Sequence, residues 1–239
     1  MSGSCSINCL EYFGLYFAAA KIGAIAVRLN FRLSSTELAY ALNDFETKIL
    51  CFHAGLAERI AQVRKEIPVE HYFCLADEKT EVPDWAAPFS ILGEGSQDEP
   101  GVASIYLNDP VMMMYTSGTT GRPKGAIWTH NTTFWFSAIQ VLKWNFSGKE
   151  TAMTTGPLYH VGAMEDVALL VLMRGGTVII TKSKNFEIQR VLSFFEKEKV
   201  TRCFLFPFMI YEMLHLSELK TYRLEDLKTI YTGGDPLMP

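Results

Sequence analysis

The sequence predicts an α/β protein made of layered sheets flanked by helices and divided into two lobes, the second of them incomplete. Short apolar segments alternate with longer amphipathic segments along most of the 239 residues, which is typical of sheets covered by helices. Hydrophobic residues make up 49% of the chain and charged residues 20%, as in ordinary globular proteins. A chain of this length buries about 70% of its unfolded surface, so a core forms without metals or disulfides.

The elements expected in the first lobe begin with a long helix over Leu10–Val27, rich in alanine and aromatic residues. Ser34 and Glu37 have capping-box spacing, which predicts a helix that runs to about Leu42. Further expected elements are strands at 48–52, 71–75 and 111–115 and helices at 56–67 and 129–142. Residues 77–101 are rich in Asp, Glu, Pro and Gly without a period, so we expect a surface linker there.

The same alternation continues in the second half of the chain. The expected strands are 151–155, 177–181, 202–206 and 229–232, and the expected helices are 161–173, 186–199 and a helix that starts at Pro207. Gly175 and Gly176 predict the end of one helix, and Pro207 suits a first helical turn. We therefore expect a first α/β lobe over residues 1–148 and a partial second lobe over 149–239.

Composition excludes several classes of function. The net charge of −4 gives no electrostatic reason to expect nucleic acid as a partner. The five cysteines are odd in number and contain no CxxC pair, which favours reduced thiols in a cytoplasmic protein over zinc ligands. The apolar stretch 12–29 contains Lys21 and Arg28, so a buried helix is favoured over a membrane span.

The strongest local signal is YTSGTTGRPKG, residues 115–125, which follows an apolar strand. Its glycines allow open backbone conformations in which successive N–H groups bind anionic oxygens. Lys124 adds a positive charge suited to phosphate. The usual P-loop places Ser or Thr after its lysine, and here Gly125 follows Lys124. We predict a phosphate-binding loop with these contact residues: Thr116, Ser117, Gly118, Thr119, Thr120, Gly121 and Lys124.

These eleven residues resemble the phosphate-binding loop of the adenylate-forming superfamily, which includes acyl-CoA synthetases, luciferases and the adenylation domains of peptide synthetases. Three more regions resemble the family in the family's order: Asn30–Leu33 with Glu37–Tyr40, Pro157–Gly162 and Thr232–Leu237. The resemblance therefore extends over essentially the whole chain.

The resemblance implies that a carboxylate attacks ATP to give acyl-AMP and pyrophosphate, after which coenzyme A takes the acyl group. It implies ATP, Mg²⁺ and coenzyme A as cofactors, with the Mg²⁺ ligand beyond Pro239 and no metal ligand in this chain. Lys124 and His160 would be the catalytic residues, and the adenosine would lie against Gly233, Gly234, Asp235 and Pro236. The acyl pocket would be formed by Tyr159, His160, Gly162, Met164 and Phe208, with Phe206 nearby; core packing is the alternative for the aromatic residues and Met164.

The resemblance also narrows the substrate. Amino-acid-activating relatives have an aspartate near the position of His160, and Glu165 and Asp166 lie too far along to match it. An acid without an α-amino group is favoured, either a fatty acid, as in fatty acid metabolism, or an aryl acid. A CoA ligase is favoured over a luciferase-like oxygenase.

Family members normally extend further at both ends, to a magnesium-binding glutamate and a small C-terminal domain. We therefore expect a fragment of the large N-terminal domain that is nearly inactive alone, without the C-terminal domain, and able to self-associate through exposed apolar faces. Ser2-Gly3-Ser4 looks like a linker. The alternative is a natural non-catalytic nucleotide-binding or interaction protein derived from the family.

Overall fold

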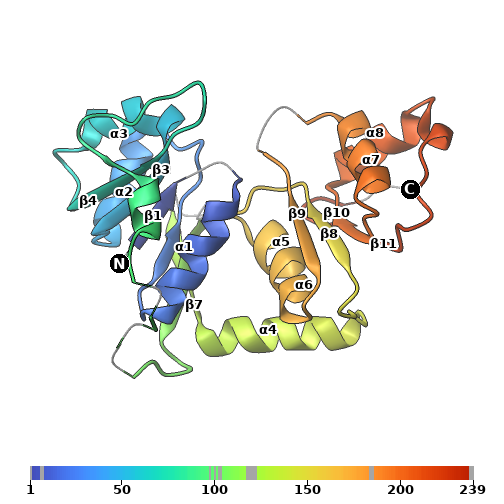
Figure 1. The fold of residues 1–239 in the computed structure, drawn as a ribbon, viewed down its shortest axis with the longest axis horizontal. Coiled ribbons are helices and arrows are strands. Elements are labelled where there is room, and N and C mark those ends of the chain that lie inside the picture. The colour runs from blue at the N-terminus through green and yellow to red at the C-terminus, as the bar shows by residue number, and fades with distance from the viewer. Residues whose placement is uncertain are drawn as a thin grey trace. The chain divides into compact units, whose positions relative to one another are not determined.

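The computed structural model describes residues 2–5, 8–96, 98–99, 101, 104–116, 123–182 and 186–236. They form two compact units, 1–132 and 133–239, each with its own sheet (Figure 1). The predicted α/β class with helix-flanked sheets is confirmed. The division falls before the boundary expected at residue 148, because Val141 and Phe146 belong to a core cluster of the second unit.

The first unit contains a seven-stranded sheet in the order β5–β4–β3–β1–β2–β6–β7. Its strands are β1 (Ser2–Cys5), β2 (Ala26–Arg28), β3 (Ile49–His53), β4 (His71–Leu75), β5 (Ala87–Pro88), β6 (Pro110–Thr116) and β7 (Lys124–Thr129). Every neighbouring pair is parallel except β6 and β7, which are antiparallel. This exception matters for function because the predicted phosphate loop lies between these two strands.

Helices cover both faces of this sheet. They are α1 (Leu10–Lys21), α2 (Ser35–Asp44), α3 (Ala57–Val63) and the short 3₁₀ helices η1 (Ala54–Leu56) and η2 (Phe89–Gly93). Leu42 of α2 and Ile60 of α3 pack with Leu50 of β3 in one core cluster, all fully buried. On the α1 side, Tyr16 lies 6.0 Å from the buried Arg28 guanidinium of β2. The predicted capping box is confirmed: Ser34 Oγ accepts from the Glu37 N–H, and Glu37 Oε2 accepts from the Ser34 N–H.

Three predictions for the first unit are wrong in part. The helix expected over 10–27 ends at Lys21, because Gly23 turns the chain with a φ of +70° and Ala26–Arg28 then form β2. Ser2–Ser4 is not a linker: it forms most of β1, whose backbone pairs with β2 on one side and β3 on the other. The region 77–101 contains β5 and η2, and Trp85 stacks on Phe52 at 5.4 Å, so part of it packs on the core.

The second unit contains a four-stranded, all-parallel sheet in the order β11–β10–β8–β9. Its strands are β8 (Thr151–Thr154), β9 (Thr177–Ile180), β10 (Arg202–Phe204) and β11 (Thr229–Tyr231). Its helices are α5 (Val161–Ala163), the π-helical turn η3 (Met164–Ala168), α6 (Leu169–Met173), α7 (Ile188–Lys197), α8 (Pro207–His215) and the 3₁₀ helix η4 (Leu219–Thr221). Helix α4 (His130–Lys143) starts before the division and continues into this unit.

This second sheet is also buried on both faces. Met153 of β8 packs with α7 and α8, whereas the preceding residue Ala152 packs with Val167 and Leu170 on the other side. Such alternation follows from the two-residue period of a strand. Pro207 is the first residue of α8, as predicted. The helix expected over 161–173 is interrupted by the π turn, which its apolar pattern did not reveal.

Two further expectations concern the cysteine side chains and the apolar stretch 12–29. The buried residues Cys51, Cys74 and Cys203 are free thiols. Within the described ranges, none of the helices is both long and apolar enough to cross a bilayer.

Candidate functional site

The predicted phosphate loop joins the two strands of the antiparallel hairpin. Thr116 is the last residue of β6 and Lys124 the first of β7, and the two are paired in register. Thr116 Oγ1 donates to the Lys124 carbonyl oxygen at 3.3 Å. Ser117, Gly118, Thr119, Thr120 and Gly121 lie outside the described residues. The hairpin therefore holds the two ends of the loop next to each other, with Lys124 exposed at one of them.

The base of this hairpin packs closely on the end of α2. Tyr115 Oη donates to Asp44 Oδ2 at 2.7 Å, and the Tyr115 ring lies 4.7 Å from that of Phe45. Burial, the hydrogen bond to Asp44 and the Asp44 charge all raise the pKa of Tyr115, so its hydroxyl stays a donor. A Cβ at Gly125 would lie 2.7 Å from Phe45 Cζ and 2.8 Å from Met113 Sδ. Only glycine fits there without movement of these side chains.

In the second unit, the carboxyl ends of β8, β10 and β11 lie side by side (Figure 1). The segments that follow these strands are 155–160, 205–206 and 232–236. The first contains His160, and the last contains the predicted adenosine residues. In parallel α/β sheets, ligands bind beyond the carboxyl ends of the strands. The fold therefore brings two separately predicted segments to one sheet edge.

Phe204, at the end of β10, has its ring close to two glycines, Gly162 of α5 and Gly233 of the segment after β11. A Cβ at Gly162 would lie 3.7 Å from Phe204 Cζ, and one at Gly233 would lie 3.9 Å from the same atom. Both glycines thus approach one aromatic ring, from the expected acyl side and the expected adenosine side. Sequence reasoning did not identify Phe204 as a site residue, because its position in an apolar strand indicated core packing alone.

Phe206 repeats this arrangement two residues later. A Cβ at Gly234, whose φ is +90°, would lie 3.4 Å from Phe206 Cε1, and one at Gly156 would lie 3.7 Å from its Cε2. The Phe206 ring stands edge-on to Phe204 at 5.2 Å and is stacked with Phe208 at 6.2 Å. Phe208 is 51% exposed, so this aromatic row extends from the core to the surface. An apolar surface beside a glycine turn suits an acyl group next to a nucleotide.

His160 caps the short helix α5. Its Nδ1 accepts a hydrogen bond from the Gly162 N–H at 3.3 Å, so Nε2 bears the proton in the neutral ring. The side chain is exposed, whereas Tyr159 is half-buried and Met164 is fully buried. Met164 therefore packs in the core, whereas His160, four residues earlier, lies at the surface.

The π turn η3 follows α5 and contains two acidic residues, Glu165 and Asp166. Glu165 is fully buried, and Asp166 Oδ1 accepts from Gln140 Nε2 at 3.4 Å. Burial raises the pKa of Asp166, while Gln140 and the charge of His160 act against that rise. Turns of this kind are frequent at functional sites. The sequence analysis did not assign Asp166 to the site, because it lies too far along the chain from His160. The π turn that places it near His160 cannot be recognised from the sequence pattern.

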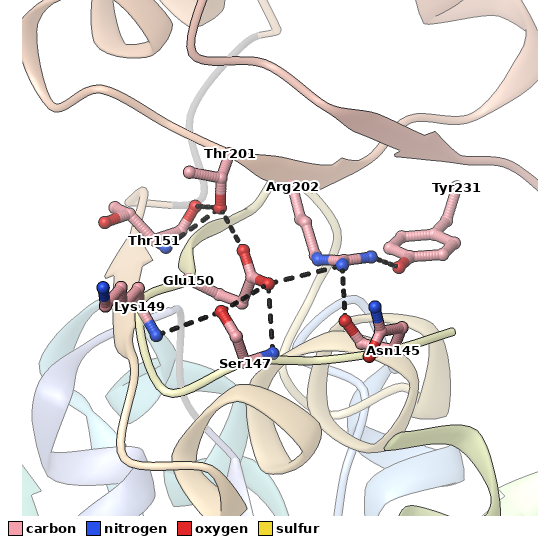
Figure 2. Close-up of polar contacts among 8 residues, drawn as sticks. All are labelled: Asn145, Ser147, Lys149, Glu150, Thr151, Thr201, Arg202 and Tyr231. Carbon is pink, nitrogen blue, oxygen red and sulfur yellow. Dashed lines mark hydrogen bonds and ion pairs between the residues drawn. The ribbon is translucent and has the colours of Figure 1, made fainter. Parts of the chain in front are cut away.

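A buried ion pair between Arg202 and Glu150 joins three segments of the second unit (Figure 2). Arg202 Nη2 donates to Glu150 Oε1 at 3.3 Å, and Arg202 Nη1 donates to the Tyr231 hydroxyl. Glu150 also accepts from Ser147 and Thr201. Burial alone would raise the pKa of Glu150, but these hydrogen bonds and the Arg202 charge lower it to about 2. No motif pointed to this cluster.

In the part of the chain that the structure describes, no group of three or more His, Cys, Asp and Glu side chains could hold a metal ion. Magnesium that arrives with ATP needs few protein ligands, because phosphate oxygens and waters fill most of its octahedral shell.

Comparison with known proteins shows similarity over nearly the whole chain. A family model described as AMP-binding enzyme matches residues 3–239. Feruloyl-CoA synthase of Amycolatopsis sp is 33% identical over 226 residues, which cover 95% of this chain and 42% of that protein. Long-chain-fatty-acid–CoA ligase FadD13 of Mycobacterium tuberculosis is 31% identical over 238 residues, 96% of this chain and 44% of that protein. The chain thus spans less than half the length of these curated relatives.

Solved structures agree with this result. The inhibitor-bound N-terminal domain of FACL13 from Mycobacterium tuberculosis matches with a TM-score of 0.84 and 26% identity, over 99% of this chain and 57% of that one. The anthranilate CoA ligase AuaEII, in complex with anthranoyl-AMP, matches with a TM-score of 0.90 over 99% of this chain and 46% of that one; at 20% identity it shares the fold. The resemblance of the loop and the three further segments is therefore confirmed, and this chain belongs to the AMP-binding enzyme family.

Proposed function

We propose that the protein is an AMP-forming acid–CoA ligase, which activates a carboxylic acid with ATP and then transfers the acyl group to coenzyme A. The observation that supports this most directly is the meeting of the His160 segment and the Gly233–Gly234 turn on Phe204 and Phe206. Acyl-AMP is one molecule with an acyl half and an adenosine half. A site for it needs an apolar surface next to a nucleotide-binding turn, and the proximity of the Gly233–Gly234 turn to the Phe204 and Phe206 rings supports such a site.

The first step needs charge stabilisation and positioning, because the substrate carboxylate is itself the nucleophile. Its oxygen bonds to the α-phosphorus of ATP while the bond from that phosphorus to pyrophosphate breaks. Lys124 and the loop from Thr116 to Gly121 would bind the departing pyrophosphate. Magnesium bound with the nucleotide would neutralise part of the phosphate charge. Gly233, Gly234, Asp235 and Pro236 would bind the adenosine.

In the second step, the sulfur of coenzyme A bonds to the acyl carbonyl carbon, the thiol proton passes to solvent and AMP leaves. His160 would shape or gate the acyl site, since its ring is held at the entrance by the Gly162 N–H. Tyr159, Gly162, Met164 and Phe208 would form the surroundings of the acyl group. For the substrate we propose an aryl or fatty acid without an α-amino group, in keeping with relatives named for feruloyl and long-chain fatty acyl groups.

The test measures ATP binding and acid-dependent ATP–pyrophosphate exchange on the same protein. Benzoate, ferulate, octanoate and palmitate cover aryl and fatty acids. We compare Lys124→Ala with Lys65→Ala, an exposed lysine of the same unit. At least one acid is expected to support exchange, even if slowly. Lys124→Ala should lower it by about 100-fold, as removal of one charge-stabilising group does, and Lys65→Ala should not.

The outcomes separate binding from chemistry. Exchange that needs an acid and Lys124 supports the proposal, and the acid that works assigns the substrate class. ATP binding without exchange for any acid would contradict acid activation by this chain.

A further inference from the structure

Arg202 is a buried cation that joins three segments of the second unit (Figure 2). Its Nη2 donates to Glu150 before β8 and to the Asn145 carbonyl oxygen at 3.2 Å. Its Nη1 donates to the Tyr231 hydroxyl at the end of β11. The guanidinium also lies over the Phe146 ring, 4.3 Å from its centroid. One side chain therefore fixes the loop before β8 and the end of β11 relative to β10.

Tyr231 is held from three directions as a result. Its carbonyl oxygen accepts from the Leu205 N–H at 2.9 Å, and its ring stacks on Trp144 with centroids 4.5 Å apart. The hydrogen bond from Arg202 fixes its hydroxyl. Only Thr232 separates this residue from Gly233 and Gly234. The residue two positions before the glycine turn is thus a tyrosine whose hydroxyl accepts a hydrogen bond from a buried arginine.

The cost of this arrangement suggests a purpose beyond folding. A buried ion pair rarely stabilises a protein more than apolar side chains of similar volume would. The arginine instead fixes the orientation of its hydrogen-bond partners, because its planar guanidinium fork presents N–H groups at fixed angles. A glycine turn has no side chains of its own to set its position, so the residues on either side must do so. A turn held in place in advance loses less freedom when a nucleotide binds.

We propose that Arg202, held by Glu150, is a positioning residue for the adenosine half of the nucleotide, acting through Tyr231 on the Gly233–Gly234 turn. This inference rests on the proposed function, because that function assigns the turn to adenosine. Arg202 is the first residue of β10 and would act on the turn through its hydrogen bond to Tyr231, without contact to a ligand. Its effect should therefore appear in adenosine binding and be absent from the binding of free phosphate chains.

The experiment uses two conservative variants of the full chain. Tyr231→Phe removes the hydroxyl that accepts from Arg202 and keeps the ring that stacks on Trp144. Arg202→Lys keeps the charge opposite Glu150 and loses the fork. Arg223→Lys is the matched control at an exposed ion pair, and Val191→Ala removes buried methyl groups from α7 as a control for lost stability. Dissociation constants for ATP and for inorganic tripolyphosphate are measured beside melting temperatures.

Tyr231→Phe and Arg202→Lys are expected to weaken ATP binding about three- to tenfold, the equivalent of about one hydrogen bond. Tripolyphosphate affinity should not change, and both controls should bind ATP as the parent does. Unchanged ATP affinity in both variants would overturn the positioning role and leave the proposed function standing. Equal weakening in Val191→Ala, or of tripolyphosphate, would reduce the role to general stability and overturn it too. A parent chain that binds no ATP would overturn the proposed function and this inference together.

Discussion

The hairpin around the predicted phosphate loop and the sheet edge around the glycine turn are held by contacts of different kinds. The hairpin relies on close packing at Gly125 and on an exposed hydrogen bond between Tyr115 and Asp44. The sheet edge relies on a buried ion pair, in which the Arg202 and Glu150 side chains are 8% and 3% exposed. Water competes with the first kind of polar contact and is excluded from the second. The two regions should therefore respond differently to the loss of one carboxylate.

Glu150→Ala should have the largest effect. It leaves Arg202 buried without its partner, which costs about 3–5 kcal/mol of unfolding free energy. Asp44→Ala is the matched change at the hairpin and should cost about 1 kcal/mol or less, because its bond is exposed and a carboxylate at the end of α2 opposes the helix dipole. Urea unfolding of both variants measures the difference. Equal losses would show that burial does not distinguish the two regions.

Acid should weaken the sheet edge in a defined range of pH. The pKa of Glu150 is about 2 in the fold, against 4.5 in an unperturbed carboxyl. Its folded pKa is lowered, so its stabilising contribution is complete above about pH 4.5 and is lost as the pH falls toward 2. We expect the stability advantage of the parent over Glu150→Gln to shrink by about 3 kcal/mol over that range.

Unfolding of both proteins at several pH values tests this expectation. The other carboxyls titrate in both proteins, so their contribution is removed when the two unfolding free energies are subtracted. An advantage that stays constant down to pH 2 would mean that the cluster does not hold the charged form of Glu150.

Gly125→Ala should lower stability less than Glu150→Ala or acid does, and its effect should be confined to the packing of the hairpin. The new methyl group would meet Phe45 and Met113 at under 3 Å, which costs about 1–3 kcal/mol when the side chains shift. ATP binding should weaken as the end of β7 moves. Gly14→Ala is the control: it lies in α1 with nothing within 4 Å of the added carbon and should stabilise by about 0.5–1 kcal/mol.

Thermal or urea unfolding and ATP affinity are measured for both glycine variants. A Gly125→Ala protein with the stability and affinity of the parent would show that Phe45 and Met113 give way freely, so that packing does not set the hairpin.

Features governed by neighbouring residues could be predicted from the sequence. The cap of α2 needs only Ser34 and Glu37, the start of α8 needs only Pro207, and the loop has a motif of contiguous residues. The α/β class followed from the alternation of short apolar and longer amphipathic segments. In each case the physical cause acts within a few residues, where a pattern can be read.

Features set by distant contacts could not be predicted. β1 has the sequence Ser-Gly-Ser-Cys, which lacks the β-branched and aromatic residues typical of strands, and it is a strand because β2 and β3 pair with its backbone on both sides. Arg202 and Glu150 are 52 positions apart, and only the parallel pairing of β8 with β10 brings them together. The π turn that places Asp166 near His160 has the same apolar sequence pattern as an ordinary helix. Residues that form a contiguous motif could therefore be identified from the sequence, and residues joined by distant contacts could not.

The strand order of the first sheet has a consequence for how the chain folds. β2 pairs with β6, so Ala26 must meet Met112, 86 positions later, before the β6–β7 hairpin becomes part of the sheet. In the second sheet the pairing of β8 with β10 joins Ala152 to Arg202, 50 positions apart. Closing longer loops costs more entropy, and topologies rich in distant pairs fold slowly. The completed first sheet, including the hairpin strands on either side of the predicted phosphate loop, thus depends on a contact between residues that are more than 80 positions apart.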